Sequence, residues 1–361
     1  MALKRLALTS FRAFEEAVFE PDHEGTTVLT GPNGTGKTSL LEAVGYLGLG
    51  RSLRGSPREA MIRNGSSSSI IRADLESDER SILIEAQLVR EGRNRIQINR
   101  QSVRTRRDLA EAVPVTTFCP DDLSVVQGGP AGRRDLLDDA LSLLDARAGA
   151  LLEDLDRILR QRNALLKGAK GRMTPDVEST LDVWDDRLIG AGDQLVAARQ
   201  DLLTSLSPLI DVSYRTLSGQ AGHDVAAVHY AASAPDGLAE GLRSARSDDL
   251  RRGITTIGPH RDDLTLLLEG RDARTQASQG EQRTFALALR LAVHLAASDH
   301  LGEPPLLLLD DVFSELDPDR ARRLVNELPP GQALVTTASP LPEGINPALV
   351  VDVTAMVPDR G

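Results

Sequence analysis

Unbroken and alternating apolar runs predict strands near both ends of the chain. The run at 306–309 consists of four leucines and ends in Asp310 and Asp311. A run without alternation is typical of a central strand covered on both faces. Two carboxylates at its end are costly to bury without a cation or donors nearby. Because open α/β sheets bind ligands at the carboxyl ends of their strands, the pattern predicts the metal-holding strand of a nucleotide site.

Shorter apolar runs predict the rest of the sheet structure. Strands at 3–8 and 26–30 come before a helical pattern at 39–48. Turn residues between the next runs predict an antiparallel layer. Further strands are expected at 70–75, 81–89, 95–99, 113–118, 264–268, 333–337 and 349–353, with helices at 281–297 and 319–328.

The middle of the chain has a helical pattern. Apolar residues recur at spacings of four and three over 137–165 and again over 181–209, with Arg162 and Ser205 as exceptions. Two such series joined by a short polar turn predict an antiparallel helical hairpin with arms of about 33 residues, roughly 50 Å long. We favour an ordinary helical lobe over a true coiled coil. Pro208 is expected to end the second helix.

A phosphate-binding loop is expected at residues 31–38, GPNGTGKT. The stretch matches G-x-x-x-x-G-K-[ST] between a predicted strand and a predicted helix. Glycines let the backbone wrap a phosphate chain, and the helix N-terminus adds a positive dipole. Lys37 is expected to reach the β- and γ-phosphates, and the Thr38 hydroxyl to bind Mg²⁺.

A second helix start carries another candidate anion site. Ser278 and Glu281 fit a capping box, which explains them as structure alone. Gly280 and the free N–H groups of the helix end also suit an anion. One nucleotide does not need two helix N-termini as anion sites. The pattern makes sense if a second copy of the protein supplies its Ser278 end to the γ-phosphate of the nucleotide bound by the first.

The positions of these motifs suggest how the domains are arranged. The phosphate loop and the acidic strand can meet only if the chain returns to one sheet, so the middle is an insertion. We expect a discontinuous ATPase lobe at 1–120 and 251–361 and a helical lobe with an arm at 121–250.

The charge of the chain as a whole and the charge of two short stretches point to different partners. The net charge of −11 argues against a nucleic-acid partner, but seven arginines and one acid lie between 90 and 107. A second cluster lies at 51–63. The chain has only four lysines, so arginine is its usual cation and clusters of arginine could arise from composition alone. A surface that faces phosphates explains the clusters equally well. Aromatic residues make up 3%, which favours backbone contact with duplex DNA over base stacking.

The chain has no signal-peptide core and no apolar run of membrane-spanning length. Its single cysteine, Cys119, excludes an internal disulfide. We expect a cytoplasmic protein. His260, in the run at 258–263, stays undecided between a structural and a functional role.

The motifs together resemble ABC-type ATPase heads. The resemblance rests on the phosphate loop, the signature-like run at 278–282, Asp310 with Asp311, and the loop at 314–317. Within that class the chain resembles the RecF family of bacterial recombination mediators, through the runs at 10–14 and 258–263 and the short arm. The resemblance implies an α/β fold: a P-loop NTPase head of mixed sheet with an antiparallel layer, plus a mostly helical second lobe with a short antiparallel helical arm.

The resemblance also implies residue roles. Asp311 stands where ABC ATPases usually place a glutamate that orients the attacking water, and Thr336 and Thr337 stand where many place a histidine; both departures favour an ATP-timed switch over a fast motor. The implied triphosphate ligands are Gly31, Pro32, Asn33, Gly34, Thr35, Gly36, Lys37, Thr38 and Ser39, with Arg12 as a further nucleotide contact. The implied Mg²⁺ ligands or sensors are Thr38, Asp310 and Gln127, the implied catalytic residues are Asp311 and Lys37, and Ser278, Gly280 and Gln282 act on the nucleotide of the opposite subunit.

The implied function is a slow, DNA-dependent ATPase of replication, DNA repair and the SOS response. ATP and Mg²⁺ drive head-to-head homodimerisation on duplex or gapped DNA, independent of sequence. Hydrolysis then releases the dimer, which helps RecO- and RecR-like mediators load recombinase, with no membrane involved. One alternative is the nucleotide-binding subunit of an ABC transporter, against which the arm and the arginines count. The other is an ATP-bound DNA scaffold that needs no turnover.

Overall fold

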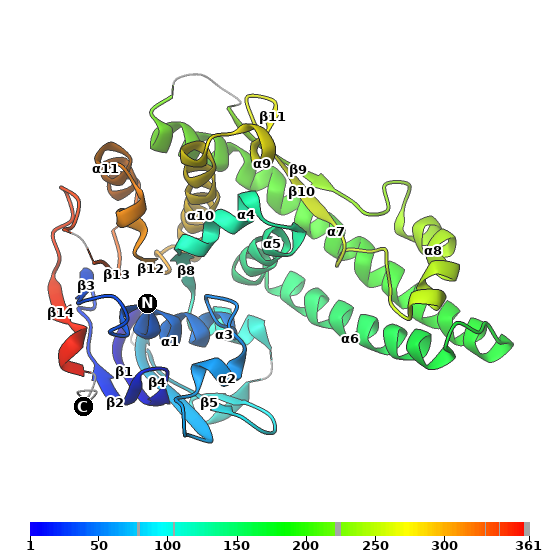
Figure 1. Ribbon diagram of the computed structural model, residues 1–361, viewed down its shortest axis with the longest axis horizontal. Helices are drawn as coiled ribbons and strands as arrows, with labels where there is room; N and C mark the ends of the chain where they lie inside the picture. The colour runs from blue at the N-terminus through cyan, green and yellow to red at the C-terminus, as the bar shows by residue number, and fades with distance from the viewer. Residues whose placement is uncertain (78–79, 104, 221–224, 329, 339, 357–361) are drawn as a thin grey trace. The chain divides into compact units, whose positions relative to one another are not determined.

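The computed structural model describes residues 1–77, 80–103, 105–220, 225–328, 330–338 and 340–356 (Figure 1). The chain forms two compact units. The first comprises Met1–Asp122, Val212–Ala221 and Arg283–Gly361, and the second comprises Leu123–Asp211 and Gly222–Gln282.

This division differs from the predicted boundaries in two places. The stretch 251–282 belongs to the second unit because β10 (Asp263–Leu268) pairs with β9 (Ala226–Ala231). The stretch 212–221 belongs to the first unit, where the Tyr214 ring packs edge-on against Phe285 at 5.7 Å between centroids. The predicted boundaries followed changes in sequence composition, whereas the boundaries in the structure are set by strand pairing and by core packing.

A five-stranded parallel sheet forms one layer of the first unit. Its strand order is β14-β3-β13-β12-β8. Every residue of β12 is buried, which confirms the prediction of a covered central strand. The five strands span Thr26–Thr30 (β3), Val115–Phe118 (β8), Leu306–Asp310 (β12), Ala333–Thr336 (β13) and Leu349–Asp352 (β14).

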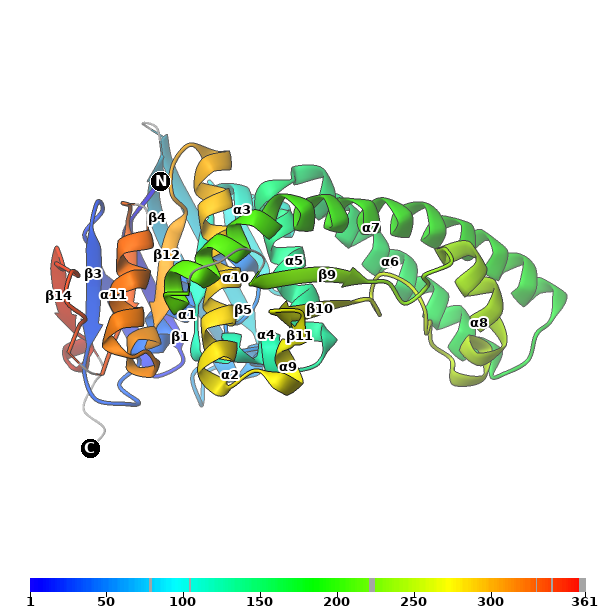
Figure 2. The same cartoon turned by 90° about the horizontal axis from the view of Figure 1, so that it is seen from above.

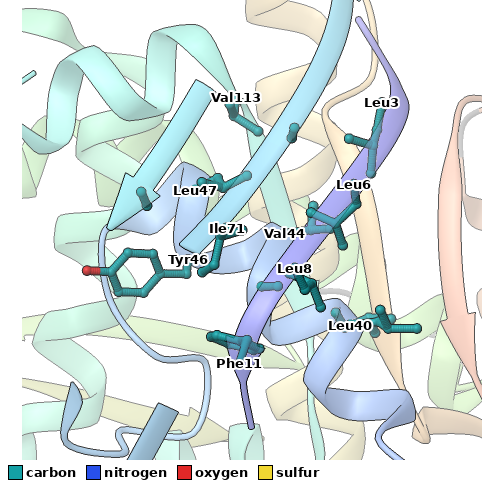
Figure 3. Close-up of a cluster of buried hydrophobic side chains, with 14 of the residues drawn as sticks. Leu3, Leu6, Leu8, Phe11, Leu40, Val44, Tyr46, Leu47, Ile71 and Val113 are labelled. Carbon is teal, nitrogen blue, oxygen red and sulfur yellow. The ribbon is translucent and has the colours of Figure 1, made fainter. Parts of the chain in front are cut away.

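A six-stranded antiparallel sheet, ordered β2-β1-β4-β5-β6-β7, forms a second layer. Helix α1 (Lys37–Leu49) lies between the two sheets, and its apolar side chains share one core with side chains from both. Figure 3 shows the part of this core where α1 meets the antiparallel sheet. The antiparallel strands span Ala2–Phe11 (β1), Phe14–Phe19 (β2), Ser68–Ser77 (β4), Arg80–Val89 (β5), Arg95–Ile98 (β6) and Gln101–Val103 (β7). The predicted antiparallel layer is therefore present.

Helices cover the other face of the parallel sheet. Helix α11 (Pro318–Glu327) and the part of α10 (Gln279–Leu301) from Arg283 onward lie on the side opposite α1 (Figures 1 and 2). His294 of α10 bonds Thr116 of β8, which fixes this helix against the sheet. Two short helices complete the unit, α2 (Arg58–Met61) and α3 (Arg106–Ala112).

The second unit is mostly helical. It contains a hairpin formed by α6 (Ala146–Ala169) and α7 (Pro175–Ser218), although α7 also enters the first unit. The predicted first arm at 137–165 is not one helix, because α5 (Pro130–Leu144) ends inside it and Asp145 caps the start of α6. The expectation that Pro208 ends this helix was wrong, because α7 continues to Ser218. Pro208 is exposed while Leu206 and Ile210 beside it are buried, so packing holds the helix together where one backbone bond is missing.

The other elements of this unit surround the hairpin. The segment 219–249, in which the sequence has little pattern, contains β9 and most of α8. The remaining elements are α4 (Leu123–Gln127), α5 (Pro130–Leu144), α8 (Leu238–Arg252), β11 (Arg271–Asp272) and α9 (Ala273–Gln276).

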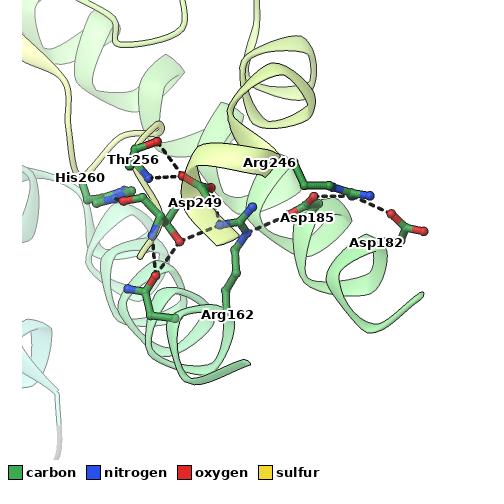
Figure 4. Close-up of polar contacts among 9 residues, drawn as sticks. Arg162, Asp182, Asp185, Arg246, Asp249, Thr256 and His260 are labelled. Carbon is green, nitrogen blue, oxygen red and sulfur yellow. Dashed lines mark hydrogen bonds and ion pairs between the residues drawn. The ribbon is translucent and has the colours of Figure 1, made fainter. Parts of the chain in front are cut away.

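Arg162, the charged exception in the first helical series, is completely buried (Figure 4). Its guanidinium donates to Asp185 at 2.7 Å, to Asp249 at 2.7 Å and to the Thr255 hydroxyl at 2.9 Å. Asp185 also accepts from Arg246 at 2.6 Å. A buried ionic network therefore ties α6 to α7, α8 and the segment after α8.

Candidate nucleotide-binding site

The loop between β3 and α1 has the backbone of a phosphate cradle. Gly31, Gly34 and Gly36 adopt positive φ angles of 137°, 83° and 99°. A Cβ at Gly36 would lie 2.7 Å from the Phe14 ring, so no larger residue fits there. The glycines thus give the loop a shape that other residues would strain, and the loop runs directly into the N-terminus of α1.

Two hydroxyls converge on the carboxylate at the end of β12. Thr38 Oγ1 and Thr336 Oγ1 each donate to Asp310 Oδ1 at 2.7 Å. Arg54 lies 3.7 Å from the other carboxylate oxygen. Lys37 is buried and donates to the Gly31 carbonyl and, at 3.0 Å, to the Pro32 carbonyl. Sheet pairing thus joins residues from the two ends of the chain in one cluster.

Asp311 has an unusual backbone and an unpaired side-chain atom. Its φ is 50°, in the left-handed region, and its N–H donates to Thr336 Oγ1 at 2.9 Å. Its Oδ1 is buried and has no hydrogen-bond partner among the described residues. A buried carboxylate oxygen without a donor is costly, so this atom has the capacity to accept a hydrogen bond from a ligand or water.

Arg12, a predicted nucleotide contact, is engaged by a buried acid. Its guanidinium donates to both oxygens of Glu42 at 2.7 Å and to the Ala60 carbonyl at 2.8 Å. Glu42 is 1% exposed and also accepts from Ser52. This pair was not predicted from the sequence, in which only the helical position of Glu42, five residues after Lys37, indicates that it lies near the loop.

The second unit holds the remaining predicted site residues. Ser278 and Glu281 form the reciprocal capping box: the Ser278 N–H donates to the Glu281 carboxylate at 2.7 Å, and the Glu281 N–H donates to Ser278 Oγ at 3.3 Å. Gln127 donates to Gln282 Oε1 at 2.6 Å. Gln282 is 5% exposed and donates to the Ala273 carbonyl at 2.9 Å. Gln127 is therefore linked directly to the signature-like run, while Ser278 stays exposed.

His260 lies against the loop that follows α8. Its Nε2 is 3.1 Å from the Thr255 carbonyl, and burial lowers the pKa of the imidazole below its ordinary value. Thr255 in turn bonds Arg162. These contacts place His260 beside the buried ionic network.

The arginine-rich stretches contain two groups, in addition to Arg54 near Asp310 and Arg107 paired with Glu111. Arg58, Arg63 and Arg90 donate to backbone carbonyls of Gly92, Ala13 and Ser66 at 2.7–2.8 Å, so they brace loops. The second group points to solvent. Its members, Arg93, Arg95 and Arg100, are exposed, and their side chains have no ion-pair partner within the described ranges. Arg104 lies outside the described residues.

The donor set suits a magnesium–nucleotide complex. Asp310 and Thr38 supply hard oxygens of the kind that Mg²⁺ prefers, and Mg²⁺ bound to nucleotides takes one or two carboxylates, with phosphates and water as its other ligands. Among the described residues no group of three or more histidines, cysteines or acids could hold a metal alone. The geometry therefore fits a cation that arrives with a phosphate chain.

The first unit has a glycine loop and an acidic strand end on a parallel sheet beside an antiparallel one, and the second unit has a capped signature-like helix start. Together these features define an ATPase head of the ABC and SMC type. A family model described as RecF/RecN/SMC N terminal domain matches residues 2–339. The chain belongs to the RecF family. It is 41% identical over 355 residues to the DNA replication and repair protein RecF of Streptomyces avermitilis, with 94% of each chain covered.

Other relatives agree. The RecF protein of Acidothermus cellulolyticus is 38% identical over 353 residues, again with 94% of each chain covered. A solved structure of the recombination mediator protein RecF with ATP, in the RecFOR pathway, is similar at a TM-score of 0.87 and 28% identity, covering 97% of this chain and 94% of that one. An Smc head bound to the C-terminal winged-helix domain of ScpA shares the fold alone, at a TM-score of 0.53 and 14% identity, covering 99% and 92%.

Proposed function

We propose that the protein is an ATP-dependent DNA-binding switch of recombinational repair. ATP with Mg²⁺ drives two heads together on duplex or gapped DNA, and slow hydrolysis separates them. The observation that carries the proposal is the contact between Thr38 and Asp310 at 2.7 Å beside the glycine loop. The ATP-bound relative supports it, because that structure covers nearly the whole chain.

Nucleotide binding is assigned to the first unit. The backbone N–H groups of residues 31–39 other than Pro32, and the N-terminus of α1, bind the phosphates. Lys37 leaves the Gly31 and Pro32 carbonyls to neutralise them. Thr38 and Asp310 hold Mg²⁺, which supplies charge neutralisation at the phosphates. Thr336 keeps Asp310 oriented through its hydroxyl.

Hydrolysis is assigned to Asp311. Its unpaired Oδ1 accepts a hydrogen bond from the attacking water, and its short side chain reaches less far than a glutamate, which favours slow turnover. We expect Asp311→Asn to bind ATP normally and to lose turnover at least tenfold. Unchanged turnover in this variant would remove Asp311 from the mechanism.

Dimerisation is assigned to the exposed Ser278 end of α10. Ser278→Asp separates the two interpretations of this residue, because aspartate caps a helix as well as serine does but repels a phosphate. We expect the parent and Ser278→Thr to form dimers with ATP and Mg²⁺ but not with ADP. Ser278→Asp should stay monomeric with unchanged thermal stability.

Light scattering coupled to size exclusion measures the mass in each state. A parent protein that stays monomeric with ATP, with and without DNA, would refute the paired-head proposal. A Ser278→Asp protein that dimerises normally would leave Ser278 as a helix cap only.

DNA contact is assigned to the hairpin of β6 and β7 and the turn before it. Replacing Arg93, Arg95 and Arg100 by glutamine should weaken duplex binding and lower the slope of log K against log salt by about one for each phosphate that is no longer neutralised. The matched control replaces Arg243, Arg251 and Arg252 of α8, which are also exposed but paired with acids. Equal weakening in both triple variants would argue against this surface.

Mediator proteins are the proposed partners of the ATP-bound dimer. The support is the description of the ATP-bound relative as part of a RecFOR pathway. We expect the ATP-bound dimer on gapped DNA to bind RecR- and RecO-like proteins and to speed recombinase loading. Loading rates that do not change when the protein is added would count against this role.

The second candidate is an ATP-bound scaffold that acts without turnover. It is favoured by Asp311 in place of a glutamate and by Thr336 and Thr337 in place of a histidine. Repair that survives Asp311→Asn would select it. The transporter alternative has no support from the relatives, and none of the helices in the described parts of the chain could cross a membrane.

A further inference from the structure

The two long helices of the second unit, α6 and α7, leave an open groove between them, with a volume of about 540 Å³. Leu151 and Ile158 of α6 and Ala191 of α7 supply apolar lining, and polar and charged side chains make up much of the rest. On α6 the groove extends from Leu151 to Gln161, which is roughly 15 Å of helix. Its shape is therefore that of a surface channel between two antiparallel helices.

Helix α8 covers a different side of this hairpin. Arg246 of α8 donates to Asp182 and to Asp185 of α7, at 2.6 Å in each case (Figure 4). Residues two positions apart in an α-helix lie about 200° apart round its axis, so Arg187 points away from the side on which Asp185 meets α8. The groove, which Arg187 lines, thus stays open to solvent.

An aromatic side chain lies in this open groove. Trp184 is the only tryptophan in the chain, and it is partly exposed. The guanidinium of Arg187 lies 5.1 Å from the centroid of its ring, where the ring face attracts the cation. Two turns further along α7, Gly190 has open space where a Cβ would lie, and Ala191 is small. Tryptophan and arginine are the residues that most often anchor protein interfaces, and here they stand beside free space.

The charges along the groove are mostly positive. Arg157 and Arg187 line it together with one acid, Asp154, which pairs with Arg157 at 2.5 Å. Arg147 precedes Asp154 by seven residues, so it lies on nearly the same face of α6, and it is exposed. Neither Arg147 nor Arg187 has an ion-pair partner within the described parts of the chain. Three arginines and one aspartate thus follow the groove on a chain whose net charge is −11.

The neighbouring acids point elsewhere. Asp186 and Asp193 of α7, and Glu153 and Asp156 of α6, each lie more than about 100° round the helix axis from the middle of the residues that line the groove. The positive charge is therefore a property of the groove, and it complements an acidic partner.

We propose that this groove binds an acidic amphipathic helix of a partner protein. Such a helix places apolar residues, spaced three and four apart, against Ile158 and Trp184. Carboxylates beside those residues then pair with the three arginines. Duplex DNA fits the arginines but brings nothing apolar to cover Trp184. The site lies within the second unit and does not depend on the proposed function.

The test uses the full chain and a synthetic peptide of about 18 residues, long enough to form a helix. The peptide contains leucine, glutamate and alanine, with leucines at spacings of three and four and glutamates beside them. Its matched control has lysine in place of every glutamate. Neither peptide contains tryptophan, so Trp184 alone reports binding. We expect the glutamate peptide to change the Trp184 fluorescence in a saturable way and the lysine peptide to bind at least tenfold more weakly.

A charge reversal tests the location. Arg187→Glu should weaken binding of the glutamate peptide at least tenfold and strengthen binding of the lysine peptide, a reversal that a folding defect would not produce. Arg243→Glu on α8, at a side chain 72% exposed and outside the lining, is the matched control and should bind both peptides like the parent.

Several results would overturn the proposal. They are equal binding of the two peptides, no saturable change at 1 mM glutamate peptide, and an Arg187→Glu protein that binds like the parent. Displacement of the glutamate peptide by duplex DNA would assign the groove to phosphates instead. A nucleotide-free dimer that Arg187→Glu dissolves would assign it to a second copy of the chain.

Discussion

The buried arginine of the arm allows a quantitative prediction. Arg162→Met removes three hydrogen bonds of 2.7–2.9 Å and the positive charge at the centre of the network. Asp185 keeps Arg246 as a partner. Asp249, which is 0% exposed, keeps only the Thr256 N–H at 2.9 Å and hydroxyl at 2.6 Å.

An uncompensated buried charge of this kind costs about 3–5 kcal/mol. With a urea dependence of about 1–3 kcal/mol per molar, the unfolding midpoint should fall by roughly 1–5 M. Neutralising the partner should recover part of this loss, so Arg162→Met with Asp249→Asn is expected to be more stable than Arg162→Met alone. The direction of this second effect is the stronger test, because a simple loss of packing would not produce it.

The assay is urea unfolding followed by the fluorescence of Trp184, the only tryptophan in the chain, which directly precedes Asp185. Arg160→Met is the control on the same helix: Arg160 pairs with Asp156, but the two are 66% and 64% exposed, so its loss should cost less than about 1 kcal/mol. Equal midpoints for Arg162→Met and Arg160→Met would refute the reasoning, as would a double variant no more stable than the single one.

Three further predictions follow from the same structure. Gly36→Ala should lower the melting temperature, because its φ of 99° is unfavourable and the new Cβ meets the Phe14 ring; full stability would contradict this, and Phe14→Leu should relieve part of the loss. Burial lowers the pKa of His294 from about 6.5 in the unfolded chain to about 4 in the folded protein, so the free energy of unfolding should fall by up to about 3 kcal/mol as pH drops from 6.5 towards 4. His294→Gln should flatten this part of the pH–stability curve, and an unchanged curve would contradict the assignment. Pro208→Ala should raise stability by about 1 kcal/mol or more in urea unfolding, since it restores a bond inside α7; no gain would mean that the helix already compensates.

Strong local patterns account for the parts of the fold that were predicted. The leucines of β12, the glycine loop and the two helices of the hairpin are each predicted by a pattern that lies within the element itself. Helix α8 does not: only a few of its side chains, such as Leu242 and Leu250, are buried. Its position depends on Asp249 meeting Arg162, 87 residues away, and no local pattern encodes that contact.

The candidate site shows the same division. Lys37, Thr38 and Asp310 were predicted because their motifs are local. In the sequence, Thr336 stands out only because it occupies a position where many ABC ATPases have a histidine. In the structure its hydroxyl donates to Asp310 and accepts from the Asp311 N–H. That role follows from the pairing of β13 with β12, which sets Thr336 beside Asp310 in register. The Phe14 ring at Gly36 likewise depends on packing of the antiparallel sheet over α1.

The order of strands in the parallel sheet has a consequence for synthesis of the protein. Strand β3 pairs only with β13 and β14, which lie about 300 residues later in the sequence. A ribosome therefore releases the glycine loop long before either neighbour of its strand exists, while the hairpin and α8 can pair as soon as they emerge. Contacts so distant in sequence form late and slowly. The growing chain thus carries an incomplete parallel sheet until translation is nearly finished, and a copy that ends before residue 333 lacks both strands that pair with β3.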